Sequence, residues 1–72
     1  MSAVRNFRKS QKWDIETLAR KLNIRSINTA YQVEAGSRSI TLDTAKELEK
    51  VSGISRVVWL YPNEYENPYN DK

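Results

Sequence analysis

Four uncharged polar side chains recur within residues 26–38, and their chemistry is that of base recognition. Asn28, Tyr31 and Gln32 share one side of a predicted helix, and Thr29 lies beside them. A carboxamide presents a hydrogen-bond donor and an acceptor side by side, which matches N6 and N7 of adenine in the major groove of DNA. Thr29 and Tyr31 are suited to a thymine methyl group or a phosphate. We therefore predict that these four side chains read bases.

The same helix lacks the charges of an ordinary exposed helix surface, which Lys and Glu usually fill. No acidic residue lies between Ile27 and Val33, as a surface that approaches phosphates requires. A polar surface without a partner is the alternative interpretation. Residues at both ends of the helix are suited to phosphate, with solvated charge as the alternative for the arginines. We predict phosphate contacts from Arg25, Ser26, Ser37 and Arg38.

The residue types that support most catalysis and metal binding are missing. The 72-residue chain has no Cys and no His, so ordinary zinc ligation and Ser-His or Cys-His nucleophilic catalysis are out of reach. The carboxylates are scattered and form no evident acid/base pair. We predict a protein that is not an enzyme and uses no metal and no cofactor.

The basic residues are concentrated in the first part of the chain. Residues 1–40 carry eight basic and three acidic side chains, whereas residues 41–72 carry four basic and six acidic ones. This imbalance predicts a polyanion partner for the first part, with a merely solvated basic surface as the alternative. No apolar run approaches the roughly 18 residues of a membrane span, and the first ten residues lack the apolar core of a signal peptide. We expect a cytoplasmic protein without membrane contact.

Apolar spacing and cap residues predict one all-α domain of five short helices. The predicted helices cover residues 3–11, 15–22, 27 to about 36, 42–51 and 56–61, and the last four begin after Asp14, Ser26, Thr41 and Ser55. The third helix should bury Ile27, Ala30 and Val33. For Ile27 we prefer this core position to a thymine contact. The fourth helix should bury Leu42, Ala45 and Leu48.

The last predicted helix is more apolar than a single turn requires. Trp59 and Leu60 can fill the core, but the remaining apolar residues cannot all point inward. We predict that Val57, Val58 and Tyr61 form a dimer interface, with core capping alone as the alternative. The domain should cover residues 1–61. Residues 62–72 contain two prolines and no aliphatic residue, so we expect a flexible acidic, tyrosine-containing tail: disordered, docked on a partner subunit, or folded on another protein.

Several motifs occur in an order that is typical of one family. The first is Phe7-Arg8 in the first helix, and the second is ETLARKL, which follows Asp14. The third consists of Glu34, Gly36 and Arg38 around the end of the third helix. The fourth is Gly53-Ile54-Ser55 before the last helix. Each motif is weak alone, but together they resemble the lambda-repressor and Cro-type (XRE-like) helix-turn-helix DNA-binding family. The resemblance covers roughly residues 4–60.

The resemblance implies a lambda-repressor-like domain with the helix-turn-helix at the second and third helices. It also implies a homodimer on a palindromic operator, and a structural ion pair between Arg8 and Glu34. One residue more than usual separates Leu22 from Glu34, which predicts a longer turn between these helices. Ile15 stands where the family usually places a phosphate-binding Gln, so we assign that contact to Lys12 or to the N–H groups that begin the second helix.

Together these features predict a sequence-specific regulator of double-stranded DNA, of Cro or phage-repressor type, that acts by occupying an operator. It would be bacterial or phage-encoded and associated with the nucleoid through DNA. The antitoxin of a toxin–antitoxin pair fits the same fold. A protein-interaction module whose tail binds a protein partner is the alternative from another class.

Overall fold

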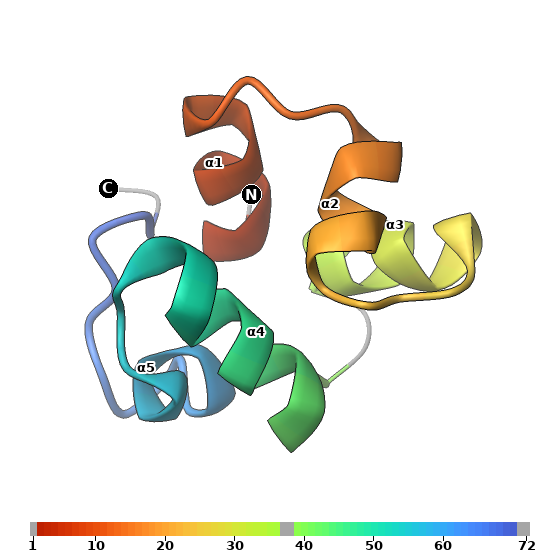
Figure 1. Cartoon of the computed structure of the whole chain (residues 1–72). Helices are drawn as coiled ribbons and strands as arrows, with labels where there is room; N and C mark the ends of the chain where they lie inside the picture. Colours follow the sequence, from red (N-terminus) through yellow and green to blue (C-terminus); the bar gives the residue numbers. More distant parts are fainter. Residues whose placement is uncertain (1, 37–38, 71–72) are drawn as a thin grey trace.

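A computed structural model describes residues 2–36 and 39–70, and in these ranges the chain forms five α-helices and no strand (Figure 1). The helices are α1 (Ala3–Ser10), α2 (Ile15–Lys21), α3 (Ile27–Ala35), α4 (Leu42–Ser52) and α5 (Arg56–Leu60). The predicted all-α class is confirmed, and the predicted helix boundaries agree to within one residue.

Side-chain caps determine where the helices begin. Each helix follows a Ser, Thr or Asp whose side-chain oxygen accepts a backbone N–H of the first turn: Ser2, Asp14, Ser26, Thr41 and Ser55. Such a cap satisfies an N–H that has no partner inside the helix. α3 ends at Gly36, which has φ +78°. Because L side chains are strained in this left-handed region, a glycine suits the sharp exit from α3.

The core is built around Phe7 of α1, whose ring makes edge-on contacts with aromatic residues from the turn after α1, from α5 and from the C-terminal segment. Its centroid lies 5.5 Å from that of Trp13, 5.9 Å from that of Trp59 and 5.1 Å from that of Tyr69. Leu18 and Leu48 are fully buried beside this cluster. The aromatic contacts therefore join both ends of the chain to one core.

Two residues that the sequence placed in the core lie on the surface instead. Ile27 is 38% exposed and Leu42 is 50% exposed, although Ala30 and Ala45, one turn later, are fully buried. Ile27 and Leu42 are the first residues of α3 and α4. A helical side chain points back over the turn that precedes it in the helix. The side chain of the first residue therefore points beyond the end of the helix and away from the core.

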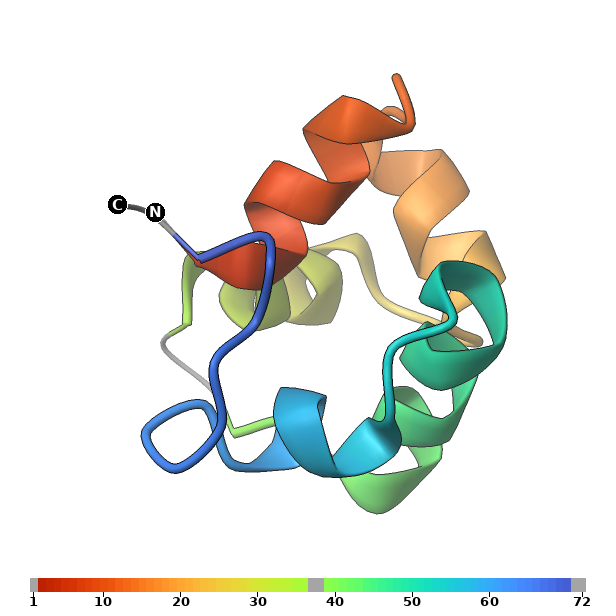
Figure 2. The same cartoon turned by 90° about the vertical axis from the view of Figure 1, so that its left-hand side faces the viewer.

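The C-terminal segment, residues 62–70, folds back along α1 (Figure 2). Asn6 Nδ2 donates to the carbonyl oxygen of Tyr69 at 2.7 Å, and the Tyr69 ring packs on Phe7. Asn67 is buried, and its Oδ1 accepts the N–H of Tyr69 at 2.9 Å. This packing differs from the loose tail that the composition predicts, because one aromatic side chain and one carboxamide anchor the segment without any aliphatic residue.

The two sides of the molecule differ in what they carry. α2 and α3 lie together on one side, whereas α5 and the C-terminal segment lie on the other (Figures 1 and 2). The acidic residues Glu64 and Glu66 belong to the C-terminal segment.

Candidate nucleic-acid interface

The outward side of α3 carries the predicted base-reading residues. Asn28, Tyr31 and Gln32 are exposed, and Thr29 is half-buried. Ala30 and Val33, on the opposite side, are buried against the rest of the domain. Apart from Ile27, the helix therefore divides as the sequence predicts, with its carboxamides and phenol facing outward.

The single acidic residue of α3 points inward. Glu34 is only 6% exposed, and its carboxylate pairs with the Arg8 guanidinium in a two-pronged arrangement. Arg8 Nε lies 2.9 Å from Oε2, and Nη2 lies 3.2 Å from Oε1. The predicted ion pair is thus present. Its burial leaves the exposed residues of α3 without a negative charge, so none of them would repel a phosphate.

Further contacts fix the C-terminal half of α3 against α1. Arg5 Nε lies 3.3 Å from Glu34 Oε1 as a second ion pair, which the sequence motifs do not predict. Ser2 Oγ donates to the backbone carbonyl of Glu34. Arg8 also donates from Nη1 to the carbonyl oxygen of Trp13 at 2.7 Å. α3 therefore takes its orientation from α1 and from the turn that leads to α2.

The predicted phosphate contacts lie around α3 or before α2. Arg25 is exposed immediately before the N-cap of α3, and Ser26 is that N-cap, with Oγ 3.5 Å from the N–H of Thr29. Lys12 is exposed in the turn between α1 and α2. Ser37 and Arg38 lie outside the described residues.

Lys12 adopts a backbone conformation that L side chains rarely take. Its φ is +60°, and Asn23, in the turn after α2, has φ +56°. The left-handed region costs a residue with a Cβ roughly 1–2 kcal/mol. Asn tolerates this region better than most residues, whereas a Lys there is uncommon. The turn before α2 therefore keeps a basic side chain where a glycine would be less strained.

The start of α2 carries a fixed negative charge. The Asp14 carboxylate accepts the N–H of Thr17 at 2.8 Å. This hydrogen bonding, together with the nearby arginines Arg20 and Arg8, lowers the pKa of Asp14 below its ordinary value of 3.8. The carboxylate occupies the N–H of Thr17 and keeps a negative charge at the start of α2, which disfavours a phosphate close to this helix end.

Ile27 also belongs to this surface, although its spacing predicts a position in the core. It is exposed at the start of α3, one helical turn before Tyr31. Side chains four residues apart share one side of a helix. Ile27 therefore adds an apolar contact surface to the hydrogen-bonding groups of α3, and a thymine methyl group is the base feature that such a surface suits.

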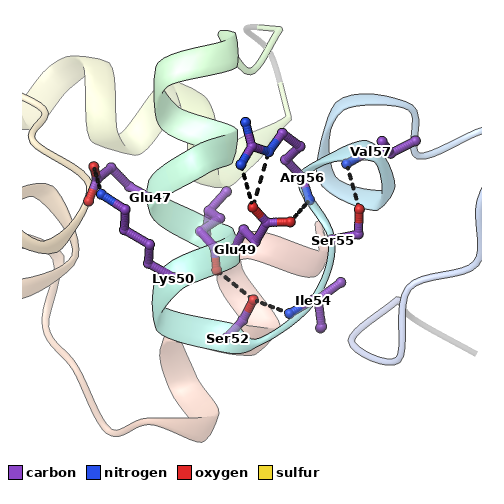
Figure 3. Close-up of polar contacts among 9 residues, drawn as sticks. Glu47, Glu49, Lys50, Ser52, Ile54, Ser55, Arg56 and Val57 are labelled. Carbon is purple, nitrogen blue, oxygen red and sulfur yellow. Dashed lines mark hydrogen bonds and ion pairs between the residues drawn. The ribbon is translucent and has the colours of Figure 1, made fainter.

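The predicted dimer residues lie on and after α5, whose start is anchored by Arg56. The Glu49 carboxylate of α4 accepts the Arg56 backbone N–H at 3.1 Å, Nε at 3.0 Å and Nη2 at 2.8 Å (Figure 3). These bonds lower the pKa of Glu49 below its ordinary value of 4.5. Val57 and Val58 are half-buried, and Tyr61 is exposed.

The described part of the chain contains no cluster of acidic residues that could hold a metal ion. Within the same residues, no helix has both the length and the apolar character needed to cross a membrane.

Comparison with known proteins identifies the family. The family model described as Helix-turn-helix matches residues 4–59, which is most of the chain. Comparisons with curated proteins and with solved structures gave no match. The arrangement of α2 and α3, the inward-facing Glu34 and the family match lead to one conclusion. The chain belongs to the lambda-repressor (XRE) type of the helix-turn-helix family, whose domains bind DNA in gene regulation.

Proposed function

We propose that the protein is a sequence-specific transcriptional repressor that reads the major groove with the outward side of α3. The observation that carries this proposal is the burial of Glu34. Because the one acid of α3 pairs with Arg8, the exposed side of the helix offers only neutral groups. A helix that enters the groove needs such a surface, since phosphates line both edges of the groove.

The side chains have separate roles in this proposal. Asn28 and Gln32 read base edges through their carboxamides, with Thr29 and Tyr31 beside them. Ile27 contacts a thymine methyl group. Phosphate contacts come from Lys12, Arg25 and Ser26, and from Ser37 and Arg38 after the helix. Phosphate contacts orient the protein on the duplex, whereas base contacts select the sequence.

The repressor acts as a two-fold dimer on a palindromic operator. Val57, Val58 and Tyr61 supply the contact between copies. Helix-turn-helix dimers place their two reading helices about one turn of DNA apart, so protein symmetry and operator symmetry correspond. The bound dimer obstructs transcription by occupying its site.

The alternative of a module that binds a protein through its tail has less support. Tyr69 and Asn67 already pack within their own chain. A partner that captured them would have to separate the segment from α1. An antitoxin that binds DNA through the same α3 surface remains compatible with the proposal.

Binding isotherms over a salt series test the proposal, on a duplex selected from a random library and on a scrambled duplex. Asn28→Ala or Gln32→Ala should cost about 1–3 kcal/mol on the selected duplex and relax preference at one base pair of each half-site. Arg25→Ala should weaken binding to both duplexes and lower the salt slope by about one unit.

Lys50→Ala is the control, because Lys50 is also exposed but lies on α4, where its Nζ is 3.5 Å from Glu47 Oε1, instead of at the edge of α3. It should leave the salt slope almost unchanged. If both carboxamide variants lose specific and non-specific binding equally, α3 is not the reading element and the proposal fails.

A further inference from the structure

The first turn of α3 exposes an aliphatic side chain that the core does not use. Ile27 is 38% exposed. It belongs neither to the buried core cluster nor to the partly buried apolar side chains that pack on that cluster. Single exposed aliphatic residues are common on protein surfaces, so the meaning of this one depends on its neighbours.

The neighbours of Ile27 give it an apolar and a hydrogen-bonding side. Tyr31 is 53% exposed one turn later, and Asn28 is exposed as well. Side chains three and four residues apart are neighbours on a helix, so Tyr31 adjoins both Ile27 and Asn28. No charged residue lies between Ser26 and Val33. Ile27 and the ring of Tyr31 therefore form a neutral, apolar surface with a carboxamide at its edge.

The major groove offers one kind of partner for an apolar surface. Among the hydrogen-bond donors and acceptors of the base edges, the apolar group is the methyl group on C5 of thymine. The N-terminal residues of a reading helix are those that reach base edges, and Ile27 is the first residue of α3. The same methyl group occurs on the same ring carbon of 5-methylcytosine, whereas unmodified cytosine lacks it.

We propose that Ile27 and Tyr31 bind the C5 methyl group of a pyrimidine, whether thymine or 5-methylcytosine, so that methylation of one cytosine in the target strengthens binding. This inference rests on the proposed reading of the major groove by α3 and names the feature that Ile27 recognises. An isoleucine side chain makes no hydrogen bond, so it does not distinguish O4 of thymine from the N4 amino group of 5-methylcytosine. Cytosine methylation in DNA would therefore change how fully the protein occupies its site.

The size of the effect follows from the apolar area that one methyl group removes from water. Burial of one such group should raise affinity about four-fold. A methyl contact neutralises no phosphate and releases no counterion, so this gain should be the same at low and high salt. Independence from salt separates the contact of Ile27 from the phosphate contacts proposed for Lys12 and Arg25.

Binding isotherms on the duplex selected from a random library test the methyl site. Replacement of thymines one at a time by deoxyuridine removes only the C5 methyl group, and at one position of a half-site it should weaken wild-type binding about four-fold. That base pair is then replaced by a C·G pair, with or without a methyl group on C5 of the cytosine. The methylated duplex should bind about four-fold more tightly than the unmethylated one. Ile27→Ala should reduce both methyl effects to less than about two-fold, because the apolar surface is lost.

Leu42→Ala is the matched control, because Leu42 is also an exposed aliphatic residue, at 50%, and is the first residue of α4. It should leave both methyl effects at their wild-type size. Ile27→Val keeps an apolar side chain and should retain most of each effect. Circular dichroism should show the same helix content in every variant, since both positions are on the surface.

The possible results separate the methyl site from base reading as a whole. Deoxyuridine replacements that all leave wild-type affinity unchanged, or an Ile27→Ala variant with the full methyl effects, would overturn the methyl site but leave base reading by Asn28 and Gln32 standing. A thymine effect without any gain from 5-methylcytosine would also overturn it, because the site would then recognise thymine and not the methyl group. A library selection without any preferred sequence would remove both the proposed function and this inference.

Discussion

Glu34 connects α3 to three residues of the N-terminal region. Its carboxylate pairs with Arg8 and Arg5, and its backbone carbonyl accepts from Ser2 Oγ. A buried carboxylate of this kind adds little net stability, because its desolvation offsets much of the attraction. The buried carboxylate instead fixes the orientation of the two helices, because α3 must pack on α1 with Glu34 next to Arg8 for the charge to be paired.

Removing one partner of this pair should cost more than the pair itself contributes. We expect Glu34→Gln to lower the free energy of unfolding by about 1–3 kcal/mol, because Arg8 would lose a charged hydrogen-bond partner in a buried position. Thermal melts of Arg8→Met, Glu34→Gln and the double variant form a thermodynamic cycle. The double variant should lose less stability than the two single variants lose in total. If the losses of stability are strictly additive, the two groups are not coupled.

Lys12 combines backbone strain with a basic side chain, and these two properties can be separated. We expect Lys12→Gly to stabilise the fold by about 1 kcal/mol, because glycine adopts φ +60° without a Cβ clash. The same change should weaken binding to all DNA sequences and lower the salt slope by about one unit. Chemical denaturation and salt-dependent binding isotherms measure the two effects.

Asn23 provides the matched control for Lys12, since it has φ +56° in the other left-handed turn. Asn23→Gly should stabilise the fold by less, because asparagine tolerates this region, and it should leave the salt slope unchanged. If Lys12→Gly binds DNA with the wild-type salt slope, then Lys12 makes no phosphate contact.

At the scale of the elements, local chemistry made the helices predictable. Asp14, Ser26, Thr41 and Ser55 each provide a cap in the sequence, and each cap forms in the structure. Apolar spacing alone misplaced Ile27, because spacing identifies a side of a helix but not how far along that side the core extends. The division of α3 into a buried and an exposed side was still predictable.

The contact of Arg56 with Glu49 makes the α4–α5 junction sensitive to acid. The lowered pKa of Glu49 means that its stabilising effect is complete above the ordinary value of 4.5 and is lost as the pH falls through the folded value. We expect urea denaturation, followed by tryptophan fluorescence, to show lower stability near pH 3 than near pH 6. Asp14, whose pKa is also lowered, should contribute in the same direction.

Glu49→Gln should reduce this dependence on pH without removing it, because Asp14 still titrates. Asp14→Asn should preserve the cap, since asparagine is also a good N-cap residue. It should remove the contribution of Asp14 to the pH dependence of stability. If the Glu49→Gln variant loses as much stability between pH 6 and pH 3 as the wild type does, the Arg56 contact does not shift the titration of Glu49.

At the scale of the whole molecule, the C-terminal segment completes the core instead of extending from it. Composition predicted a loose tail because residues 62–70 have no aliphatic residue. What holds the segment is the contact of Tyr69 with Phe7 across 62 positions of sequence, together with the bond from Asn6. Contacts at this separation have no periodic signature, so reading the sequence in short windows could not find them.

Tyr69→Ala should therefore lower the free energy of unfolding by about 1–2 kcal/mol, through loss of the aromatic contact and of buried ring surface. Tyr65→Ala is the control within the same segment, because Tyr65 is 47% exposed, and its effect should stay within about 0.5 kcal/mol. Urea unfolding measures both. Equal stability of the Tyr69→Ala variant and the wild type would show that residues 62–70 do not hold the fold.

The distance in sequence between Phe7 and Tyr69 also bears on how the protein is made. Protein synthesis proceeds from the N-terminus, so Arg8 and Glu34 can meet long before Tyr69 exists. A ribosome that stops before residue 69 releases a chain that has α3 but an incomplete core. We expect such a fragment to unfold more often and to be degraded faster by cellular proteases. Products of interrupted translation should therefore be cleared before they can compete for DNA with chains that carry the complete core.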